Sequence, residues 1–184
     1  MKAFILTLIL TVCSISVFGQ LGKKVASTPA INYDWRPGFV SINEIGGGLG
    51  LGEITADYAR NFFSVTSVNG YQFSRNVKAG IGVGIQSHND GLLFPLFFDF
   101  RFSLSAQRAV PYLSAAGGIG LNFEDINEKS RIYINPSVGV KYIVAKKVGA
   151  SLSTGLVMMA ARDYRTSFIN LKLGIEFKGN ELGR

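Results

Sequence analysis

The chain has 184 residues, a formal net charge of +7, 22 glycines and 14 phenylalanines, and 17% of its residues are charged. Its length suits one domain, and so many aromatic residues exclude an intrinsically disordered chain. Lysines and arginines are scattered one or two at a time, which excludes the clustered basic surface of a nucleic-acid-binding protein.

The first 19 residues have the pattern of a secretory signal peptide. Met1-Lys2 supplies a positive start, residues 3–12 are apolar, and the small residue Gly19 precedes Gln20. We predict export, with cleavage after Gly19. The apolar run is shorter than the roughly 20 residues that a transmembrane helix needs.

Cys13, the only cysteine, lies inside this segment. A lipoprotein signal would be cleaved before such a cysteine, but Val12 does not match the small residue expected at that place. Cleavage after Gly19 leaves an exported chain with no thiol and no disulfide. Its stability must therefore come from its architecture.

Residues 20–37 are polar and irregular, contain Tyr33-Asp34-Trp35-Arg36, and predict a periplasmic N-terminal lead. From Gly38 to Lys178, segments of about 10 to 15 residues recur between short polar breaks, and none has a sustained helical period. This stretch is the predicted folded domain, and residues 179–184 are a short tail.

Eight strands are predicted in the domain. They are Gly38–Gly52, Asn61–Phe73, Val77–Ser87, Leu92–Ser105, Val110–Glu124, Arg131–Val144, Val148–Ala160 and Thr166–Phe177. Tight breaks alternate with longer ones, which is the pattern of an outer-membrane barrel with short periplasmic turns and longer outer loops. The predicted fold is all-β, an eight-stranded antiparallel up-and-down transmembrane β-barrel.

The second strand has an irregular pattern. Phe63, Val65 and Tyr71 share one face, but Val68 does not join them. Asn69-Gly70 indicates either a tight hairpin turn or a bulge in one long strand. We favour the bulge, because Ser74-Arg75-Asn76 makes the better turn.

The fourth strand has the clearest alternation. Successive side chains of a strand point to opposite faces. One face is an apolar wall of Phe94, Leu96, Phe98, Phe100, Phe102 and Leu104, and the other carries Pro95, Phe97, Asp99, Arg101 and Ser103.

The polar faces of the strands decide which medium the apolar wall meets. They are rich in Gly, Ser and Asn with isolated charges, whereas a soluble exterior carries far more Lys and Glu. Small residues and a few opposed charges suit the filled interior of an eight-stranded barrel. We therefore predict that the apolar wall faces lipid. The alternative is a secreted, lipocalin-like barrel with its apolar face inside.

Three runs of residues carry a resemblance to a known family. They are Val68–Phe73 (VNGYQF), Ala79–Gly84 (AGIGVG) and Pro95–Arg101 (PLFFDFR), which follow the export signal in that order. Over Phe39–Phe177 the chain resembles the small outer-membrane β-barrel proteins of Bacteroidetes, in the OmpA/OmpX-like barrel superfamily. The resemblance implies an outer-membrane location and a continuous second strand, and most members have no assigned activity. The chain departs from common outer-membrane barrels in one respect. The aromatic residue of its last strand, Phe177, is followed by Lys178–Arg184, so the assembly signal is not at the terminus.

Five charged residues on the polar faces form a candidate interior network: Asp99, Arg101, Lys141, Lys172 and Glu176, with Glu44 near them. We interpret the network as structural, because an unpaired buried charge is costly and an eight-stranded barrel leaves little lumen. The alternative is a selectivity path for ions.

The sequence offers no catalytic, cofactor or metal site. His88 is the only histidine, and adjacent Ser87 points to the opposite face of a strand, so the two do not easily share a proton. We predict that His88 is a solvated loop residue. One histidine and no mature cysteine exclude a typical transition-metal site. The glycine tracts Gly46–Gly52 and Gly80–Gly84 lack the helix and the Lys-Ser/Thr of a phosphate loop, and we interpret them as packing space or strand curvature.

Two further groups lie near the predicted strand ends. Aromatic girdles are expected where a barrel meets the membrane surfaces, and Tyr33, Trp35, Tyr112, Tyr142 and Tyr164 are the candidates. We interpret the cations at the tight turns as solvated and periplasmic: Arg75, Lys78, Arg108, Lys146 and Lys147.

The predicted function is therefore that of a non-enzymatic outer-membrane barrel with a structural or surface-binding role. Its expected partners are outer-membrane lipids, the barrel-assembly machinery, and a protein or surface ligand at the extracellular loops. Two alternatives stay open, a lipid-modifying deacylase or acyltransferase and a narrow channel or secretion accessory.

Overall fold

The computed structural model describes residues 33–51, 60–88, 91–105, 107–123, 130–160 and 165–179. Its strands are β1 Gly38–Gly50, β2 Asn61–Gln72, β3 Val77–His88, β4 Gly91–Ser103, β5 Ala109–Leu121, β6 Arg131–Ala145, β7 Val148–Ala160 and β8 Arg165–Lys178. All eight predicted strands are confirmed, and the largest difference is at the end of β5, at Leu121 rather than Glu124. The described part of the chain contains no helix long and apolar enough to span a membrane.

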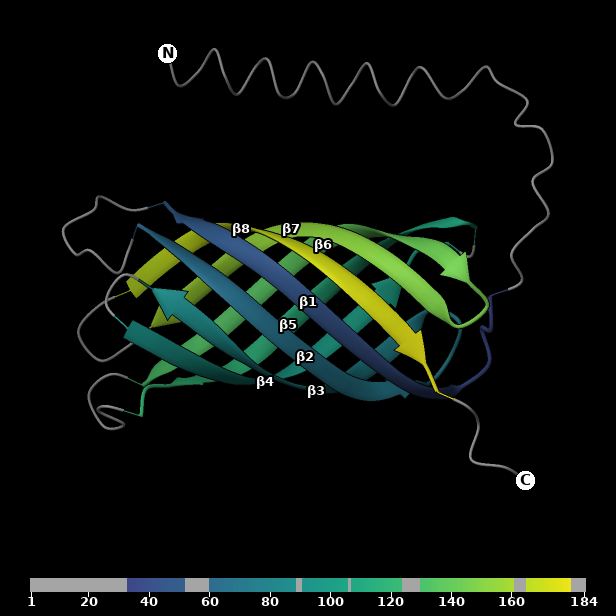
Figure 1. Ribbon diagram of the computed structural model, residues 1–184, viewed down its shortest axis with the longest axis horizontal. Coiled ribbons are helices and arrows are strands. Elements are labelled where there is room, and N and C mark those ends of the chain that lie inside the picture. The colour runs from purple at the N-terminus through teal and green to yellow at the C-terminus, as the bar shows by residue number, and fades with distance from the viewer. Residues whose placement is uncertain are drawn as a thin grey trace, which may run out of the picture. The chain divides into compact units, whose positions relative to one another are not determined.

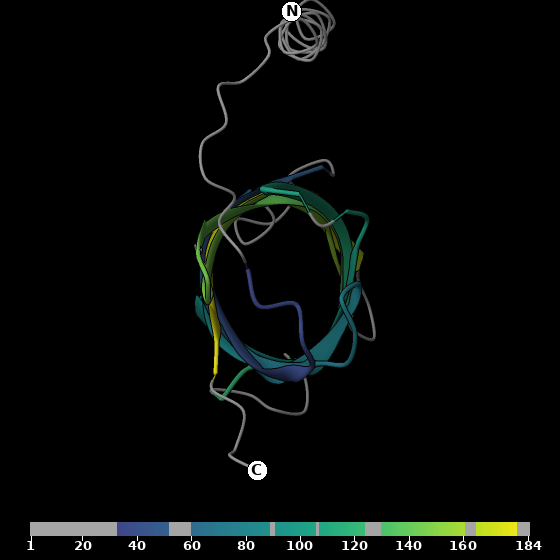
Figure 2. The ribbon, with the colours of Figure 1, turned by 90° about the vertical axis from the view of Figure 1, so that its right-hand side faces the viewer.

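The eight strands form one closed barrel (Figures 1 and 2). Each strand pairs antiparallel with its neighbour in sequence, and β8 pairs with β1. Ile45 of β1, for example, lies opposite Val65 of β2 and Leu173 of β8. Closure leaves no free sheet edge, so every strand finds hydrogen-bond partners on both sides.

The two ends of the barrel differ in their connections. The turn end carries the short connections between β2 and β3, β4 and β5, and β6 and β7, together with residues 33–37 and Gly179. At the loop end β1, β3, β5 and β7 end, and β2, β4, β6 and β8 begin. The predicted signal peptide with its cleavage after Gly19, the lead up to residue 32 and the tail beyond Gly179 lie outside the described residues.

The polarity predicted for β4 is confirmed. Phe98 is 73% exposed on the outer surface, whereas Asp99 is 4% exposed and faces the interior. The same alternation continues around the barrel, with large apolar side chains outside and small or charged side chains inside. This arrangement excludes the lipocalin-like alternative, which places the apolar face inside.

Strand β2 runs without interruption through Asn69 and Gly70, so the predicted bulge is wrong. Its pairing with β1 and β3 keeps register throughout. Val68 breaks the outer pattern because it faces inward and is 2% exposed. Gly70 is required by a close approach to Gly80, because a Cβ on Gly70 would lie 2.6 Å from the Cα atom of Gly80.

Inward-facing glycines make room for aromatic rings. A Cβ on Gly48 would lie 2.1 Å from the ring of Phe62, and one on Gly82 would lie 2.3 Å from the ring of Phe97. The glycine tracts therefore act as packing space, as the sequence indicated.

Several predictions for residues near the strand ends are wrong. Tyr33 and Tyr112 lie inside the barrel rather than in a girdle, and Lys78 is buried rather than solvated at a turn. Lys78 has the same parity as inward-facing Gly82, so the alternation of β3 carries its side chain into the lumen. Tyr142 does face outward, and Tyr164 lies outside the described residues.

Candidate functional site

The interior of the barrel is the candidate functional site, because it gathers the buried charges. Its middle cluster consists of Glu44, Asp99, Arg101 and Lys172. Arg101 Nη1 lies 2.9 Å from Glu44 Oε1, and Arg101 Nε lies 2.6 Å from Asp99 Oδ2. Lys172 Nζ lies 3.5 Å from Glu44 Oε2. Two acids and two bases therefore meet, which gives the low-dielectric centre of the barrel a balanced charge.

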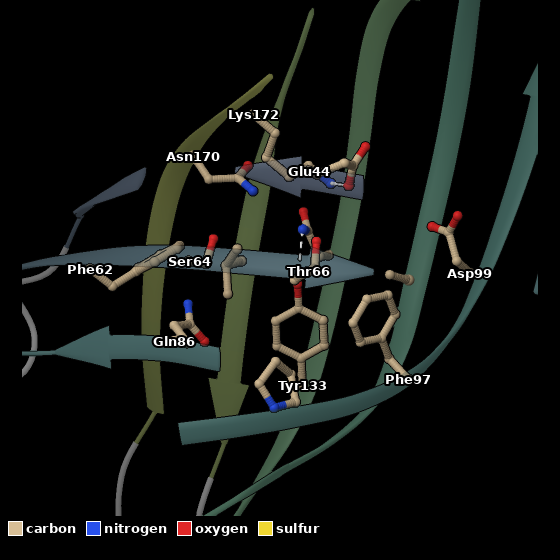
Figure 3. A pocket seen from close by; sticks show the side chains of 14 residues that line it. Glu44, Phe62, Ser64, Thr66, Gln86, Phe97, Asp99, Tyr133, Asn170 and Lys172 are labelled. Atoms are coloured by element: carbon tan, nitrogen blue, oxygen red, sulfur yellow. Dashed lines mark hydrogen bonds and ion pairs between the residues drawn. The ribbon is translucent and has the colours of Figure 1, made fainter. Parts of the chain in front are cut away.

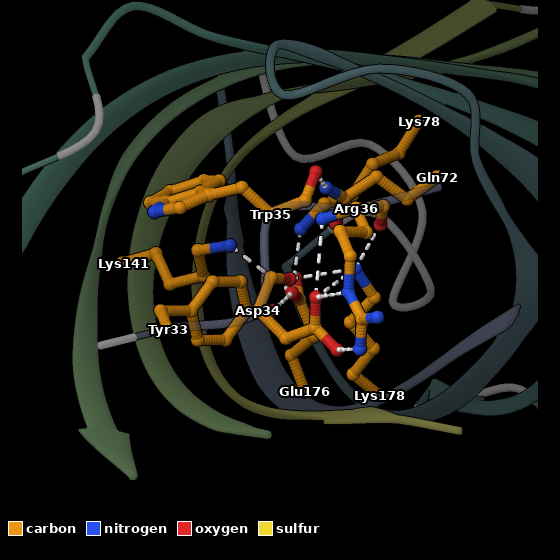
Figure 4. A network of polar contacts seen from close by, with 9 residues as sticks. All are labelled: Tyr33, Asp34, Trp35, Arg36, Gln72, Lys78, Lys141, Glu176 and Lys178. Carbon is orange, nitrogen blue, oxygen red and sulfur yellow. Dashed lines mark hydrogen bonds and ion pairs between the residues drawn. The ribbon is translucent and has the colours of Figure 1, made fainter. Parts of the chain in front are cut away.

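The turn-end cluster is built on one carboxylate, Glu176 of β8. Its Oε1 atom accepts hydrogen bonds from Lys78 Nζ at 2.5 Å and from Lys141 Nζ at 3.0 Å (Figure 4). The Tyr33 hydroxyl donates to the same oxygen at 2.5 Å. Strands β3, β6 and β8 and the segment before β1 are thereby joined across the lumen.

The segment of residues 33–37, which we call the plug, lies across the turn end of the barrel (Figure 2). Gln72 Nε2 donates to the Trp35 carbonyl oxygen at 2.8 Å, and Lys178 Nζ donates to the Asp34 carbonyl oxygen at 2.6 Å and to that of Arg36. The Asp34 backbone N–H donates to the Lys146 carbonyl oxygen at 2.9 Å. Three separate strands or turns therefore hold the plug.

Side chains within the plug support this position. Tyr33 is 3% exposed, and its ring centroid lies 4.8 Å from that of Trp35. The Lys141 ammonium group lies 4.7 Å from the Tyr33 ring centroid, within the range of a cation–π contact. Arg36 Nε and Nη2 each donate to the Asp34 carboxylate at 3.0 Å, and these hydrogen bonds hold the pKa of Asp34 well below its usual range.

The loop-end cluster is aromatic. The rings of Phe62 and Phe168 pack at 5.2 Å, and His88 lies 5.6 Å from Phe62 and 5.8 Å from Phe168. The prediction that His88 is a solvated loop residue is wrong. Strand β3 extends to His88 and its parity turns that side chain inward, while Ser87 is exposed on the outer surface. The expected separation of Ser87 and His88 is confirmed.

The space left between these clusters is very small. The cavity lined by Glu44, Phe97, Tyr133 and their neighbours has a volume of about 10 Å³ (Figure 3). The cavity between Lys78 and Tyr112 has a volume of about 10 Å³ as well. Each is at the lower limit for a single water molecule. Among the described residues, side chains therefore fill the lumen where these clusters lie.

The chain matches no protein-family model and resembles no curated protein in sequence. Solved structures do match it. Neisserial surface protein A aligns with a TM-score of 0.59 and 14% identity, over 78% of this chain and 99% of that protein. The outer membrane protein OprG of Pseudomonas aeruginosa aligns with a TM-score of 0.51 and 8% identity, over 82% and 99%. The chain has the fold of an outer-membrane β-barrel.

A third structure supports the same assignment. The N-terminal β-barrel domain of Pseudomonas aeruginosa OprF aligns with a TM-score of 0.50 and 15% identity, over 77% of this chain and 100% of that domain. At such identities the likeness concerns the fold alone. The outer-membrane barrel fold accounts for the inverted polarity of the strands, since its outward faces are apolar and its interior is polar.

The structure brings the predicted network residues together in two groups. Asp99, Arg101 and Lys172 meet in the middle cluster, and Lys141 and Glu176 meet in the turn-end cluster. Sequence reasoning missed Lys78, Tyr33, Asp34 and Lys178 as interior residues. The parity of β3 would have located Lys78, but the plug has no periodic pattern that points into a lumen. No group of three or more metal-ligating side chains is present among the described residues.

Proposed function

We propose that the chain is an integral outer-membrane β-barrel with a sealed interior, which acts as a non-catalytic scaffold and presents its loop end outside the cell. One observation carries this proposal. Apolar side chains cover the outer surface, while ion pairs and the plug fill the inside down to cavities of about 10 Å³. Export through a signal peptide cleaved after Gly19 is part of the proposal, as is membership of the OmpA/OmpX-like barrels of Bacteroidetes type, which the runs Val68–Phe73 and Pro95–Arg101 support.

The proposed orientation puts the turn end in the periplasm, because outer-membrane barrels have short periplasmic turns and longer outer loops. The partners are then outer-membrane lipids around the barrel, the assembly machinery during insertion, and a protein or surface ligand at the loop end.

The filled interior argues against the channel alternative, because an ion needs a continuous polar path through the barrel and the described lumen contains cavities of only about 10 Å³ between its clusters. The lipid-modifying alternative needs a catalytic group that lipid can reach. His88 lies inward between Phe62 and Phe168, and Ser87 points to the opposite side of the sheet. Alanine at His88 is therefore expected to leave lipid acylation unchanged.

A gel of the outer-membrane fraction tests the barrel. We expect the unboiled protein to migrate differently from the boiled protein, and identical migration would contradict a membrane barrel. The purified protein in a planar bilayer is expected to conduct no more than lipid alone, and discrete conductance steps would contradict the sealed interior.

Pull-down with the intact barrel tests the binding role. The test variant has a shortened loop between β5 and β6, in which a Gly-Ser linker replaces residues 124–129. Its heat-dependent gel shift is checked first, so that only a folded barrel is compared with the intact one. We expect the intact barrel to retain a surface ligand that loop-shortened variants lose. Equal recovery by the intact barrel and by variants shortened at each loop in turn would contradict a loop-end binding site.

A further inference from the structure

One patch of the outer surface is polar. Ser41 and Asn43 of β1 lie directly opposite Asn69 and Ser67 of β2. Asn43 and Asn69 are exposed, and the two serines are partly exposed. Elsewhere around the described barrel, outward-facing residues near the middle of the strands are apolar or glycine, apart from Thr154. We call Ser41, Asn43, Ser67 and Asn69 the polar quartet.

The quartet lies at the depth where a membrane is most apolar. Asn43 is the sixth of the 13 residues of β1, and Ser67 is the seventh of the 12 residues of β2. The apolar band of such barrels is about 25 Å tall and is crossed by about 9–11 residues of each strand. Residues at the centre of a strand therefore face hydrocarbon, on the placement in the membrane proposed above.

Polar side chains at that depth need hydrogen-bond partners, because burial of an unpaired amide in hydrocarbon is unfavourable. Thr154 meets this need within its own barrel, since its hydroxyl donates to the Asn170 carbonyl oxygen at 2.9 Å. Among the described residues, the side chains of Asn43 and Asn69 make no such hydrogen bond. Their partner must come from outside the barrel.

The surface is also hollowed beside two residues of the quartet, Asn43 and Ser67. A groove of about 670 Å³ runs over β7, β8, β1, β2 and β3, with Asn43 and Ser67 among its lining residues and apolar side chains such as Val83 and Ile175 around them. A partner that fits this groove is largely apolar and carries donors and acceptors where it meets Asn43 and Ser67.

A second copy of the chain meets these requirements. Acyl chains offer no hydrogen bond, and ester oxygens of lipids only accept, whereas an asparagine amide both donates and accepts. Consider a twofold axis that runs along the membrane normal, between the quartets of two barrels. It would place amides opposite amides and apolar residues opposite apolar residues, which is the self-complementarity that an isologous dimer needs. We propose that two barrels associate side by side through β1 and β2, with Asn43 and Asn69 hydrogen-bonded across the interface.

Cysteine cross-linking in the membrane tests the geometry. The background is Cys13→Ser, which removes the only native cysteine. Asn43→Cys places a thiol in the patch, and Ala115→Cys places one at the middle of β5, outward and on the far side of the barrel. We expect oxidation to convert Asn43→Cys into a species of twice the barrel's mass and to leave Ala115→Cys monomeric. Equal cross-linking of the two variants, or a product of any other mass, would overturn the proposal.

Energy transfer between labelled barrels in lipid vesicles tests the energetics. Asn43→Leu with Asn69→Leu removes the polar contacts and keeps an apolar surface, so we expect association at least about tenfold weaker than for the unchanged chain. A monomeric unchanged chain, or equal association of the variant, would count against the dimer. The heat-dependent gel shift distinguishes failure of the membrane-barrel proposal from failure of the dimer proposal. A variant that keeps the shift is still a membrane barrel, and only the dimer is then in question.

Discussion

Glu176→Gln is expected to destabilise the barrel strongly. Among the described residues Glu176 is the one carboxylate in ion-pair contact with Lys78 and Lys141, and all three side chains are 4% exposed. Glutamine preserves the size of the side chain but leaves two buried ammonium groups facing a neutral amide. Removal of one partner of a buried ion pair costs about 3–5 kcal/mol. We expect the free energy of unfolding to fall by that amount.

Lys172→Met in the middle cluster is the matched control. The Lys172 side chain is 11% exposed and lies 3.5 Å from Glu44, which keeps its shorter contact of 2.9 Å with Arg101. Glu44 and Asp99 keep Arg101, but the middle cluster is left with one uncompensated negative charge. We therefore expect a loss of stability that is smaller than that of Glu176→Gln, which leaves two buried ammonium groups without their carboxylate.

The measurement is urea unfolding of the barrel in lipid vesicles, with the folded fraction read from unboiled gels. Glu176→Gln combined with Lys78→Met is expected to recover part of the loss, because the second change removes one of the two unpaired charges. The reasoning would be refuted if Glu176→Gln unfolded within about 1 kcal/mol of the unchanged chain, or if the double variant were no more stable than the single one.

Three further outcomes are expected. Hydrogen bonds from Arg36 within the plug, and the Lys178 ammonium group of β8 at 3.7 Å, lower the pKa of Asp34. Because Lys178 reaches Asp34 only when the plug is docked, its share of the lowered pKa stabilises docking above pH ~4 and is lost as the pH falls through the lowered pKa. Fluorescence of Trp35, the only tryptophan, should follow that loss, and Asp34→Asn should abolish its pH dependence. Gly82→Ala should cost about 1–3 kcal/mol by overlap with the Phe97 ring, and Phe97→Leu should relieve it in urea titrations. Phe98→Arg on the outer surface should cost about 2–4 kcal/mol in vesicles, and an unchanged midpoint would mean that this face does not meet lipid.

The number of strands, their ends to within three residues, and the two faces of β4 were predictable from the sequence. This success has a local cause, because alternation of side chains along a strand depends only on residues two apart. Errors arose at the strand ends, where the alternation was not applied. Lys78 and His88 both follow the parity of β3, yet both had been predicted to be solvated.

The contacts within the lumen depend on the tertiary structure. Tyr33 meets Glu176 across 143 positions of sequence, and Lys78 meets it across 98. The local pattern of a strand says which side chains point inward, but closure of the barrel and the register of β8 against β1 decide which of them meet. The inverted polarity is therefore a property of the sequence. The plug, the paired charges and the juxtaposed polar quartet exist only once eight strands have closed around a lumen that side chains fill.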